Sequence, residues 1–234
     1  PVTKVNIDMI KNGYNLFKKE KKVSEKDLQI LFEITLNNLA TKKREPINKN
    51  NNLEDINVKA IKDQDFLDRV DVLCSIGQTV LISNYGRYYK LLDYFSRFTD
   101  KRMGIILGVM NLKDIFEDRY YDHLDGGILE GIGKMFNNDS KVYVYPYKEN
   151  KNSQIVQSKN LKVNKKIKNI YDYYLSTRRI VDIENFDQNV LNIFSHKVLH
   201  MIRNNKSGWE KMVPNYVDNL IKENRLFNFR KKSK

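Results

Sequence analysis

Two asparagines and an arginine stand where a buried sheet would present them to a ligand. Asn84 and Arg87 follow an apolar run at residues 79–83, and Asn111 follows a second run at residues 102–108. In a parallel sheet, ligands bind beyond the carboxyl ends of the strands. An asparagine amide hydrogen-bonds polar groups, and an arginine at a helix start holds phosphate or carboxylate. The pattern predicts a site at Asn84, Arg87 and Asn111, unless Asn and Gly supply only turn and cap geometry.

A pair of glycines marks a second candidate binding site. Gly126 and Gly127 precede a predicted helix that contains Glu130. Exposed amides at such a helix start can cradle an anion, so Gly126, Gly127 and Glu130 join the candidate ligand residues. However, the lysine–serine pair of a Walker motif is missing, and no strand precedes at dinucleotide-binding spacing. The alternative is structural, with Gly131 and Gly133 allowing the helix to pack closely against the sheet.

The histidines and the single cysteine give no complete metal or catalytic motif. His196 and His200 are one helical turn apart, as in zinc-binding helices, but Lys197 replaces the glutamate of that motif. We therefore expect a solvated or partner-facing histidine pair, no metal and no cofactor. Cys74 lies on an apolar helix face and is expected in the core. One cysteine allows no internal disulfide, which favours the cytoplasm or another reducing compartment.

Basic residues are concentrated in the last third of the chain. The formal net charge is +13, yet residues 1–140 carry 22 Lys and Arg against 21 Asp and Glu. Residues 141–234 carry 20 against 8. A compositional bias of the genome would spread evenly, so the asymmetry predicts a surface for an anionic partner, either RNA or an acidic protein. The expected contacts are Lys165, Lys166, Lys168, Arg178 and Arg179, with Tyr171, Tyr173, Tyr174 and Trp209 as stacking aromatics.

No recognised nucleic-acid-binding motif accompanies these basic residues. The alternative is therefore a solvated helical face in a lysine-rich proteome. Whether the chain is an enzyme stays open, because no complete catalytic constellation is visible in the sequence.

The elements that must position these residues alternate between strand and helix. Apolar runs at residues 79–83, 102–107 and 141–145 predict strands, with helical spacing between them. Nearly continuous apolar strands separated by helices indicate a parallel sheet covered on both faces. We predict an α/β fold with a small Rossmann-like βαβαβ sheet, flanking helices and a basic helical C-terminal region. Its most buried residues should be Leu81, Ile82, Ile105, Ile106, Val142 and Val144.

The rest of the chain reads mainly as helices and loops. A capping-box spacing at Ser24 predicts a helix over residues 28–39, and a second helix containing Phe66 should end at Gly77. Apolar stripes over residues 167–175, 191–201 and 213–221 predict three more helices. Polar stretches at 48–52 and 150–164 read as loops. The predicted organisation is an α/β domain with N-terminal helices over residues 1–150 and a basic helical region packed on it over residues 151–234.

Composition limits the class of protein. Hydrophobic residues make up 41% of the chain and aromatic residues 11%, which suffices for a folded core. No apolar run approaches the roughly 18 residues that a membrane-spanning helix needs. We therefore expect no membrane span.

Three segments resemble an uncharacterised bacterial family. They are TVLISNYGRYYKLLDYFSRF, the DGGILEGIGKMF and KVYVYP runs, and the closing SGWEKMVPNYVDNLIKENRLF. The family consists of longer two-part proteins labelled "TonB-dependent receptor" or "nicotinate-nucleotide adenylyltransferase". The resemblance covers nearly the whole chain and implies the C-terminal half of such a protein, with the N-terminal half or another subunit as its partner.

Neither label agrees well with the residues. An outer-membrane receptor needs many alternating strands of about ten residues, whereas this chain offers three short apolar runs. A nucleotidyltransferase of the second kind should carry an HxGH-type motif, which none of the three histidines provides. The sequence therefore favours a non-catalytic α/β module, acting as a subunit or docking domain with a basic surface. The alternative is the ligand-binding half of an enzyme acting on a nucleotide or other phosphorylated metabolite.

Overall fold

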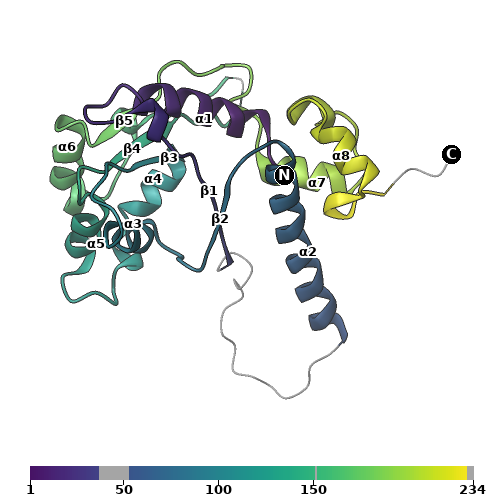
Figure 1. Ribbon diagram of the computed structural model, residues 1–234, viewed down its shortest axis with the longest axis horizontal. Coiled ribbons are helices and arrows are strands. Elements are labelled where there is room, and N and C mark those ends of the chain that lie inside the picture. The colour runs from purple at the N-terminus through teal and green to yellow at the C-terminus, as the bar shows by residue number, and fades with distance from the viewer. Residues whose placement is uncertain (37–52, 151, 231–234) are drawn as a thin grey trace. The chain divides into compact units, whose positions relative to one another are not determined.

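A computed structural model describes residues 1–36, 53–150 and 152–230 (Figure 1). The chain forms two compact units, each built from segments far apart in sequence. Unit 1 comprises residues 1–4, 29–86 and 193–234, and unit 2 comprises residues 5–28 and 87–192. Residues 151–192, expected with the C-terminal helices, thus lie in the same unit as residues 87–150. The domain division at residue 150 stays a prediction, and the predicted loop at 48–52 lies outside the described residues.

Unit 2 is built around a three-stranded parallel sheet of order β3-β4-β5. The strands are β3 (Gly104–Gly108), β4 (Lys141–Tyr145) and β5 (Ile180–Asp182). Its helices are α1 (Lys4–Phe17), α3 (Tyr88–Ser96), α4 (Val109–Ile115), α5 (Gly127–Met135) and α6 (Lys168–Ser176). Short 3-10 helices are η1 (Glu25–Asp27), η3 (Asp118–Tyr120), η4 (Ser158–Asn160) and η5 (Lys165–Ile167).

The predicted βαβαβ arrangement is present, but with a different third strand. β3 and β4 are parallel neighbours, as predicted, and Gly104 lies opposite Lys141. The other neighbour of β4 is β5, with Val142 opposite Ile180. The α/β class with a small parallel sheet is therefore confirmed. A wholly helical last third is wrong, because β5 interrupts it; its three residues are too few for periodicity to reveal.

Side chains of β4 alternate between two hydrophobic cores because successive strand residues point to opposite faces. Val142 and Val144 pack in the core that contains Leu112 and Ile132. Tyr143 and Tyr145 pack on the other face, with apolar side chains of α1. Both tyrosine hydroxyls donate to carboxylates of the N-terminal segment, to Glu20 Oε1 at 3.0 Å and Asp8 Oδ2 at 2.6 Å. The bond from Tyr145 to Asp8 ties α1 to the sheet, and the bond from Tyr143 ties down the segment after α1.

Glu20 is the centre of an ion-pair cluster beside β4. Its carboxylate accepts hydrogen bonds from Lys141 Nζ at 2.7 Å and Arg102 Nη1 at 2.7 Å, besides the Tyr143 hydroxyl. The side chains of Glu20, Lys141 and Arg102 are at most 18% exposed. Burial alone would raise the pKa of Glu20, but hydrogen bonds from Lys141 and Tyr143 and the nearby positive charges outweigh it, so the pKa is lowered.

Replacing this carboxylate should destabilise the protein in a pH-dependent way. We expect Glu20→Gln to lower the free energy of unfolding by about 2 kcal/mol at pH 7, the scale of lost charged hydrogen bonds. Because the pKa of Glu20 is lower in the folded chain, its ionised carboxylate stabilises the fold at pH values above the unfolded-chain pKa of about 4.3. This contribution is lost as the pH falls through the pKa of the folded chain. Urea unfolding at pH 7 and pH 3 should therefore show a large difference between wild type and variant at pH 7 and a small one at pH 3. An equal difference at both pH values would contradict the assignment.

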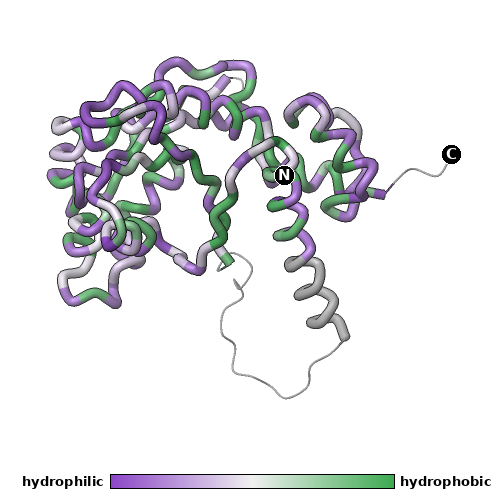
Figure 2. The backbone as a smooth tube through the Cα atoms, viewed as in Figure 1, coloured by the Kyte–Doolittle hydropathy of each residue, from purple (hydrophilic) through white to green (hydrophobic). Residues whose placement is uncertain are grey.

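Unit 1 combines helices with a two-stranded parallel sheet. The sheet pairs β1 (Phe32–Thr35) with β2 (Val80–Ser83). Figure 2 colours the residues of these strands by their hydropathy. The helices are α2 (Leu53–Ser75), α7 (Ser195–Arg203) and α8 (Val217–Glu223), with 3-10 helices η6 (Trp209–Met212) and η7 (Leu226–Asn228). One hydrophobic core joins these elements, and Trp209 and Phe227 are nearly fully buried in it.

Two predictions about strands and helices are wrong in unit 1. The helix expected over residues 28–39 is, in its described part, the strand β1, and the capping-box segment forms only the short helix η1. Residues 79–83 do form a strand, but Phe32 lies opposite Val80, so the partner is β1 and not β3. Apolar spacing identified the strand, whereas its partner depends on contacts about 50 residues away.

Burial was predicted better for the central strand than elsewhere. Val142 and Val144 are buried, as expected. Leu81, Ile105 and Ile106 are only partly buried. Ile82 is 50% exposed, because a sheet of only two strands leaves its own side chains incompletely covered. Cys74 is exposed, which contradicts its expected place in the core. It lies about 100° around α2 from the buried Leu73.

The remaining helix predictions agree with the structure. α2 ends before Gly77, whose positive φ of 73° and amide bond to the Cys74 carbonyl close the helix. α6, α7 and α8 occupy the three stripes expected in the last third. Within the part of the chain that is described, no helix is both long and apolar enough to cross a membrane.

Candidate functional site

The predicted ligand residues at the strand ends do not share one sheet. Asn84 follows β2 in unit 1, whereas Arg87 and Asn111 belong to unit 2. Arg87 is the residue before α3, and its guanidinium lies over the Tyr120 ring, 4.2 Å from the centroid. Asn111 is exposed in the first turn of α4. Because β2 pairs with β1 in unit 1, Asn84 does not follow a strand of the sheet that carries Asn111.

The predicted anion cradle at the start of α5 is filled by the chain itself. Glu130 Oε2 accepts a hydrogen bond from the Gly126 amide at 3.0 Å, and its other oxygen pairs with Lys134 at 2.5 Å. These two partners lower the pKa of Glu130, with the Lys134 bond the larger cause. Gly127 has a positive φ of 55°, which glycine adopts without strain. The glycines therefore serve the turn before α5.

A tyrosine and a histidine of unit 2 form a hydrogen-bonded pair. A hydrogen bond of 2.7 Å joins the hydroxyl of the buried Tyr89 and His123 Nε2. Burial raises the pKa of Tyr89, and the charges of Lys134, Arg87 and Glu130 act on it as well. The sequence did not single out this Tyr–His pair. Such a pair can relay a proton, because both groups donate and accept hydrogen bonds.

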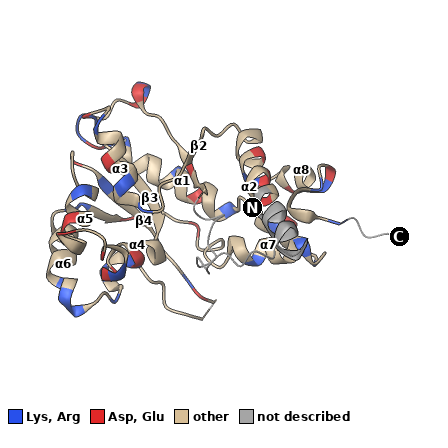
Figure 3. Cartoon of the chain, turned by 90° about the horizontal axis from the view of Figure 1, so that it is seen from below, with Lys and Arg blue, Asp and Glu red and all other residues tan. Residues whose placement is uncertain are grey.

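The five predicted basic residues differ in what they contact. Lys168 Nζ bonds Asp172 at 2.5 Å, and Arg179 pairs with Asp139 at 3.2 Å. Lys165, Lys166 and Arg178 are exposed, and no ion pair among the described residues involves them. Figure 3 shows the Lys and Arg positions along the α6 segment. Three of the five cations therefore present their charge to solvent.

The basic surplus of residues 141–234 is shared by both units. Residues 141–192 carry ten Lys and Arg against five Asp and Glu, and they belong to unit 2. Residues 193–234 carry ten against three, and they belong to unit 1. A charge concentrated in one stretch of sequence is thus divided between two folded bodies.

The aromatic residues expected beside these cations are mostly buried. Tyr171 and Trp209 are each 1% exposed, and Tyr174 stacks on Phe136 with ring centroids 4.1 Å apart. Tyr171 also donates a hydrogen bond to the Ser158 carbonyl, and burial raises the pKa of its hydroxyl. Tyr173 is 59% exposed. Among the four aromatics that the sequence suggested, Tyr173 is the one able to stack on a base.

The two histidines on α7 are both exposed. Asn204 Nδ2 donates to the His200 carbonyl at 2.8 Å, and the ring of His196 lies 5.8 Å from that of Phe194. Over the described residues, no group of three or more His, Cys, Asp or Glu side chains could hold a metal ion.

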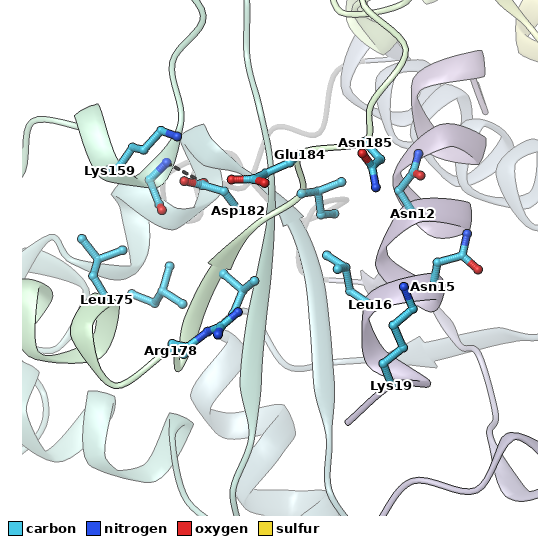
Figure 4. Close-up of a pocket in the computed structure, with 14 residues that line it drawn as sticks. Asn12, Asn15, Leu16, Lys19, Lys159, Leu175, Arg178, Asp182, Glu184 and Asn185 are labelled. Atoms are coloured by element: carbon cyan, nitrogen blue, oxygen red, sulfur yellow. Dashed lines mark hydrogen bonds between the residues drawn. The ribbon is translucent and has the colours of Figure 1, made fainter. Parts of the chain in front are cut away.

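A cleft that the sequence did not reveal runs along the edge strand β5. Its volume is about 580 Å³ (Figure 4). β5 ends the sheet order, and no other described strand pairs with its outer edge. α1 with Lys19 forms one wall, and η4 with the end of α6 forms the other. The lining residues are Asn12, Asn15, Leu16, Lys19, Ser158, Lys159, Leu175, Arg178, Ile180, Val181, Asp182, Ile183, Glu184 and Asn185.

Charged groups of both signs line the cleft along β5. Arg178 precedes the strand, whereas Asp182 ends it and Glu184 follows. Figure 4 shows Lys19, just after α1, on the opposite side of the cleft from Arg178, with Asn12 near Asn185 and Lys159 beside Asp182. Asp182 Oδ1 accepts a hydrogen bond of 2.8 Å from the Ser158 amide, which fixes its carboxylate.

One wall of this cleft has a recognisable pattern in the sequence. Asn12, Asn15, Leu16 and Lys19 are spaced as one face of a helix, and three of them are polar. Leu16 packs against a core, whereas the three polar residues are not fully buried. The opposite wall could not be predicted from the sequence, because β5 itself was not predicted.

Comparison of the chain with protein-family models, with curated proteins and with solved structures found no match. The resemblance to the two-part bacterial family therefore stays an expectation, and functional assignment rests on the geometry of the two units.

Proposed function

We propose that the chain is a non-catalytic binding module that docks single-stranded RNA through residues 159–178 of unit 2. One observation carries the proposal: Tyr173 is an exposed aromatic on a helix flanked by Lys165, Lys166 and Arg178, which form no ion pair with a described carboxylate, whereas Lys168 is paired with Asp172. Single-stranded nucleic acid is bound by cations that meet its phosphates and by aromatic rings on which bases stack. Both kinds of group are present here without a base-reading motif, so we expect binding with little sequence preference.

The helix that carries Tyr173 supports this arrangement. Tyr171 and Tyr174 face the core of unit 2, which turns Tyr173 outward. Lys166 precedes Tyr173 by seven residues, about two helical turns, so both lie on a similar side of the η5–α6 segment. Asn164 accepts a bond from the Lys166 amide at 3.1 Å and fixes the start of this segment. A base stacked on Tyr173 would therefore bring its neighbouring phosphates toward lysines.

Removing two of these charges should weaken RNA binding and flatten its salt dependence. We expect Lys165→Gln/Lys166→Gln to lower the slope of log affinity against log salt by about 1.4, since each phosphate contact on a single strand contributes about 0.7. Tyr173→Ala should cost about 1–3 kcal/mol, the loss of one stacked base. Fluorescence anisotropy with a 15-nucleotide oligo(U), repeated between 50 and 300 mM salt, measures both.

Matched variants make the result specific. Lys11→Gln/Lys101→Gln removes the same charge from exposed positions outside residues 159–178 and should leave the slope nearly unchanged. Tyr173→Phe keeps the ring and should bind like wild type. Equal losses in the two lysine pairs would reduce the effect to net charge and overturn the proposal. A preference for an acidic peptide over RNA, with a shallow salt dependence, would assign the surface to an acidic protein instead.

Association with other parts of a larger assembly is a second element of this proposal. The family resemblance favours the N-terminal half of a longer protein, or another subunit, as a partner. Co-purification of the chain with its natural partners, followed by nuclease treatment, separates protein partners from those held through RNA.

A further inference from the structure

We propose that unit 2 holds a second binding site, at the start of α3, for the phosphoryl group of a small phosphorylated metabolite. Its centre is a pair of arginines, Arg87 and Arg119, that lie against the ring of Tyr120. Both arginines are exposed, and both belong to unit 2. The site shares no residue with residues 159–178, so it does not rest on the proposed RNA surface.

The two arginines share one tyrosine ring. The guanidinium carbon of Arg87 is 4.2 Å from the centroid of the Tyr120 ring, and that of Arg119 is 4.9 Å from the same centroid. A guanidinium that lies over a ring contacts it through its face, so its in-plane N–H groups can still donate to phosphate oxygens. Arginine has five such donors, and the Tyr120 hydroxyl accepts one from Arg119 at 3.2 Å. Two like charges held on one ring repel each other, and an anion that contacts both removes this repulsion.

Buried tyrosines hold together the two segments that carry the arginines, residues 87–90 and 119–123. The Tyr89 hydroxyl and His123 Nε2 form a hydrogen bond of 2.7 Å. The rings of Tyr89 and Tyr121 have centroids 5.6 Å apart, and both tyrosines are 3% exposed. These contacts bring the arginines to Tyr120 before a ligand arrives, which lowers the entropy that binding must cost.

The surroundings of the arginine pair are positively charged. Lys90 Nζ lies 6.0 Å from the centroid of the Tyr89 ring, and α3 begins next to Arg87 with the positive end of its dipole. The two segments hold three permanent cations and one carboxylate, Asp122. In the part of the chain that the structure describes, no ion pair involves Lys90 or Arg119. A phosphoryl group, with its negative charge and several acceptor oxygens, complements this arrangement.

Calorimetric titration of the full chain at low salt tests the site with two probes, inorganic phosphate and pyrophosphate. We expect binding, and the probe that binds more tightly identifies the source of the phosphoryl group as a monophosphate or a diphosphate. Arg119→Gln should weaken binding of that probe by about fivefold or more, because a charged fork of donors is lost. Arg119→Lys keeps the charge but not the planar fork, so it should bind less tightly than wild type.

A variant without any change of charge tests the arrangement itself. Tyr120→Leu removes the ring that positions both guanidiniums, so it should also weaken binding of the tighter probe, by about threefold or more. Its melting temperature, measured in parallel, shows whether unit 2 stays folded. Arg87→Gln changes an exposed side chain and gives the same test of the second arginine.

Controls separate the site from net charge and from the proposed RNA surface. Arg97→Gln removes the same charge at the other end of α3, where Arg97 is 70% exposed and pairs with Asp93, and should bind both probes like wild type. Lys165→Gln/Lys166→Gln should do the same. No binding of either probe at 1 mM, or equal losses in Arg119→Gln and Arg97→Gln, would overturn the site. Neither result would affect the oligo(U) measurement, which tests other residues.

Discussion

Replacing Arg203 by methionine should destabilise unit 1 by about 3 kcal/mol. Arg203, at the end of α7, forms an ion pair with Asp65 of α2, whose side chain is only 13% exposed. Removing the arginine leaves a carboxylate away from water without its counter-charge, and breaking a buried pair in this way typically costs about 3–5 kcal/mol. We take the lower end because Arg203 is itself 34% exposed. Denaturant unfolding followed by fluorescence measures the loss.

The single tryptophan makes this measurement specific to unit 1. Trp209 is the only tryptophan in the sequence, is 1% exposed and lies in the core of unit 1. Its emission therefore reports the unfolding of the unit that contains the ion pair. Lys206→Met, an exposed position close to Arg203 in sequence, should change stability by no more than about 0.5 kcal/mol.

A double variant shows whether the cost arises from the unpaired charge. Asp65→Leu/Arg203→Met removes both charges, so it should be more stable than Arg203→Met alone, because a buried pair can be replaced by apolar groups at little cost. If the two single losses simply add in the double variant, the charges do not interact and the explanation is wrong.

Two glycines in α5 should respond to alanine in opposite directions. A Cβ at Gly131 would lie 2.2 Å from the ring of Tyr121, which is 3% exposed and donates a hydrogen bond to the Ile115 carbonyl. A Cβ at Gly133 would meet nothing within 4 Å. We expect Gly131→Ala to destabilise the protein by about 2 kcal/mol through overpacking, and Gly133→Ala to stabilise it by up to about 1 kcal/mol through helix propensity.

Thermal unfolding by calorimetry compares the two variants directly. The difference of about 3 kcal/mol corresponds to roughly 6–12 °C in melting temperature for a protein of this size. Because both substitutions add one methyl group to the same helix, intrinsic propensity is matched and only the surroundings differ. Similar melting temperatures would mean that the Tyr121 ring moves aside without cost.

The same pair of glycines shows what sequence reasoning could and could not supply. The pattern suggested that both allow close packing of α5 against the sheet. Gly131 does allow a close approach, but its neighbour is a tyrosine ring, and Gly133 has no neighbour that requires it. A glycine in a sequence indicates that space is limited or that the backbone is unusual. The object that limits the space is known only after folding.

The sequence by itself determined the fold class and most of the local elements. Near-continuous apolar runs identified β2, β3 and β4, and apolar stripes identified the helices from α3 to α8, because burial imposes a period of 2 or 3.6 on each element. It also determined where the basic residues are concentrated. It did not determine β1, where Phe32 and Leu36 fit a helix as well as a strand, or β5, which is too short to show a period.

Only the tertiary structure decided which elements meet. β2 pairs with β1 and β4 pairs with β5, so the predicted ligand residues after β2 and β3 belong to different units. The same pairing leaves β5 at a sheet edge, where Lys19 and Arg178, 159 positions apart in the chain, line one cleft. The physical reason is that a side-chain pattern records whether a face is buried, whereas strand pairing and cavities depend on which distant segment covers that face.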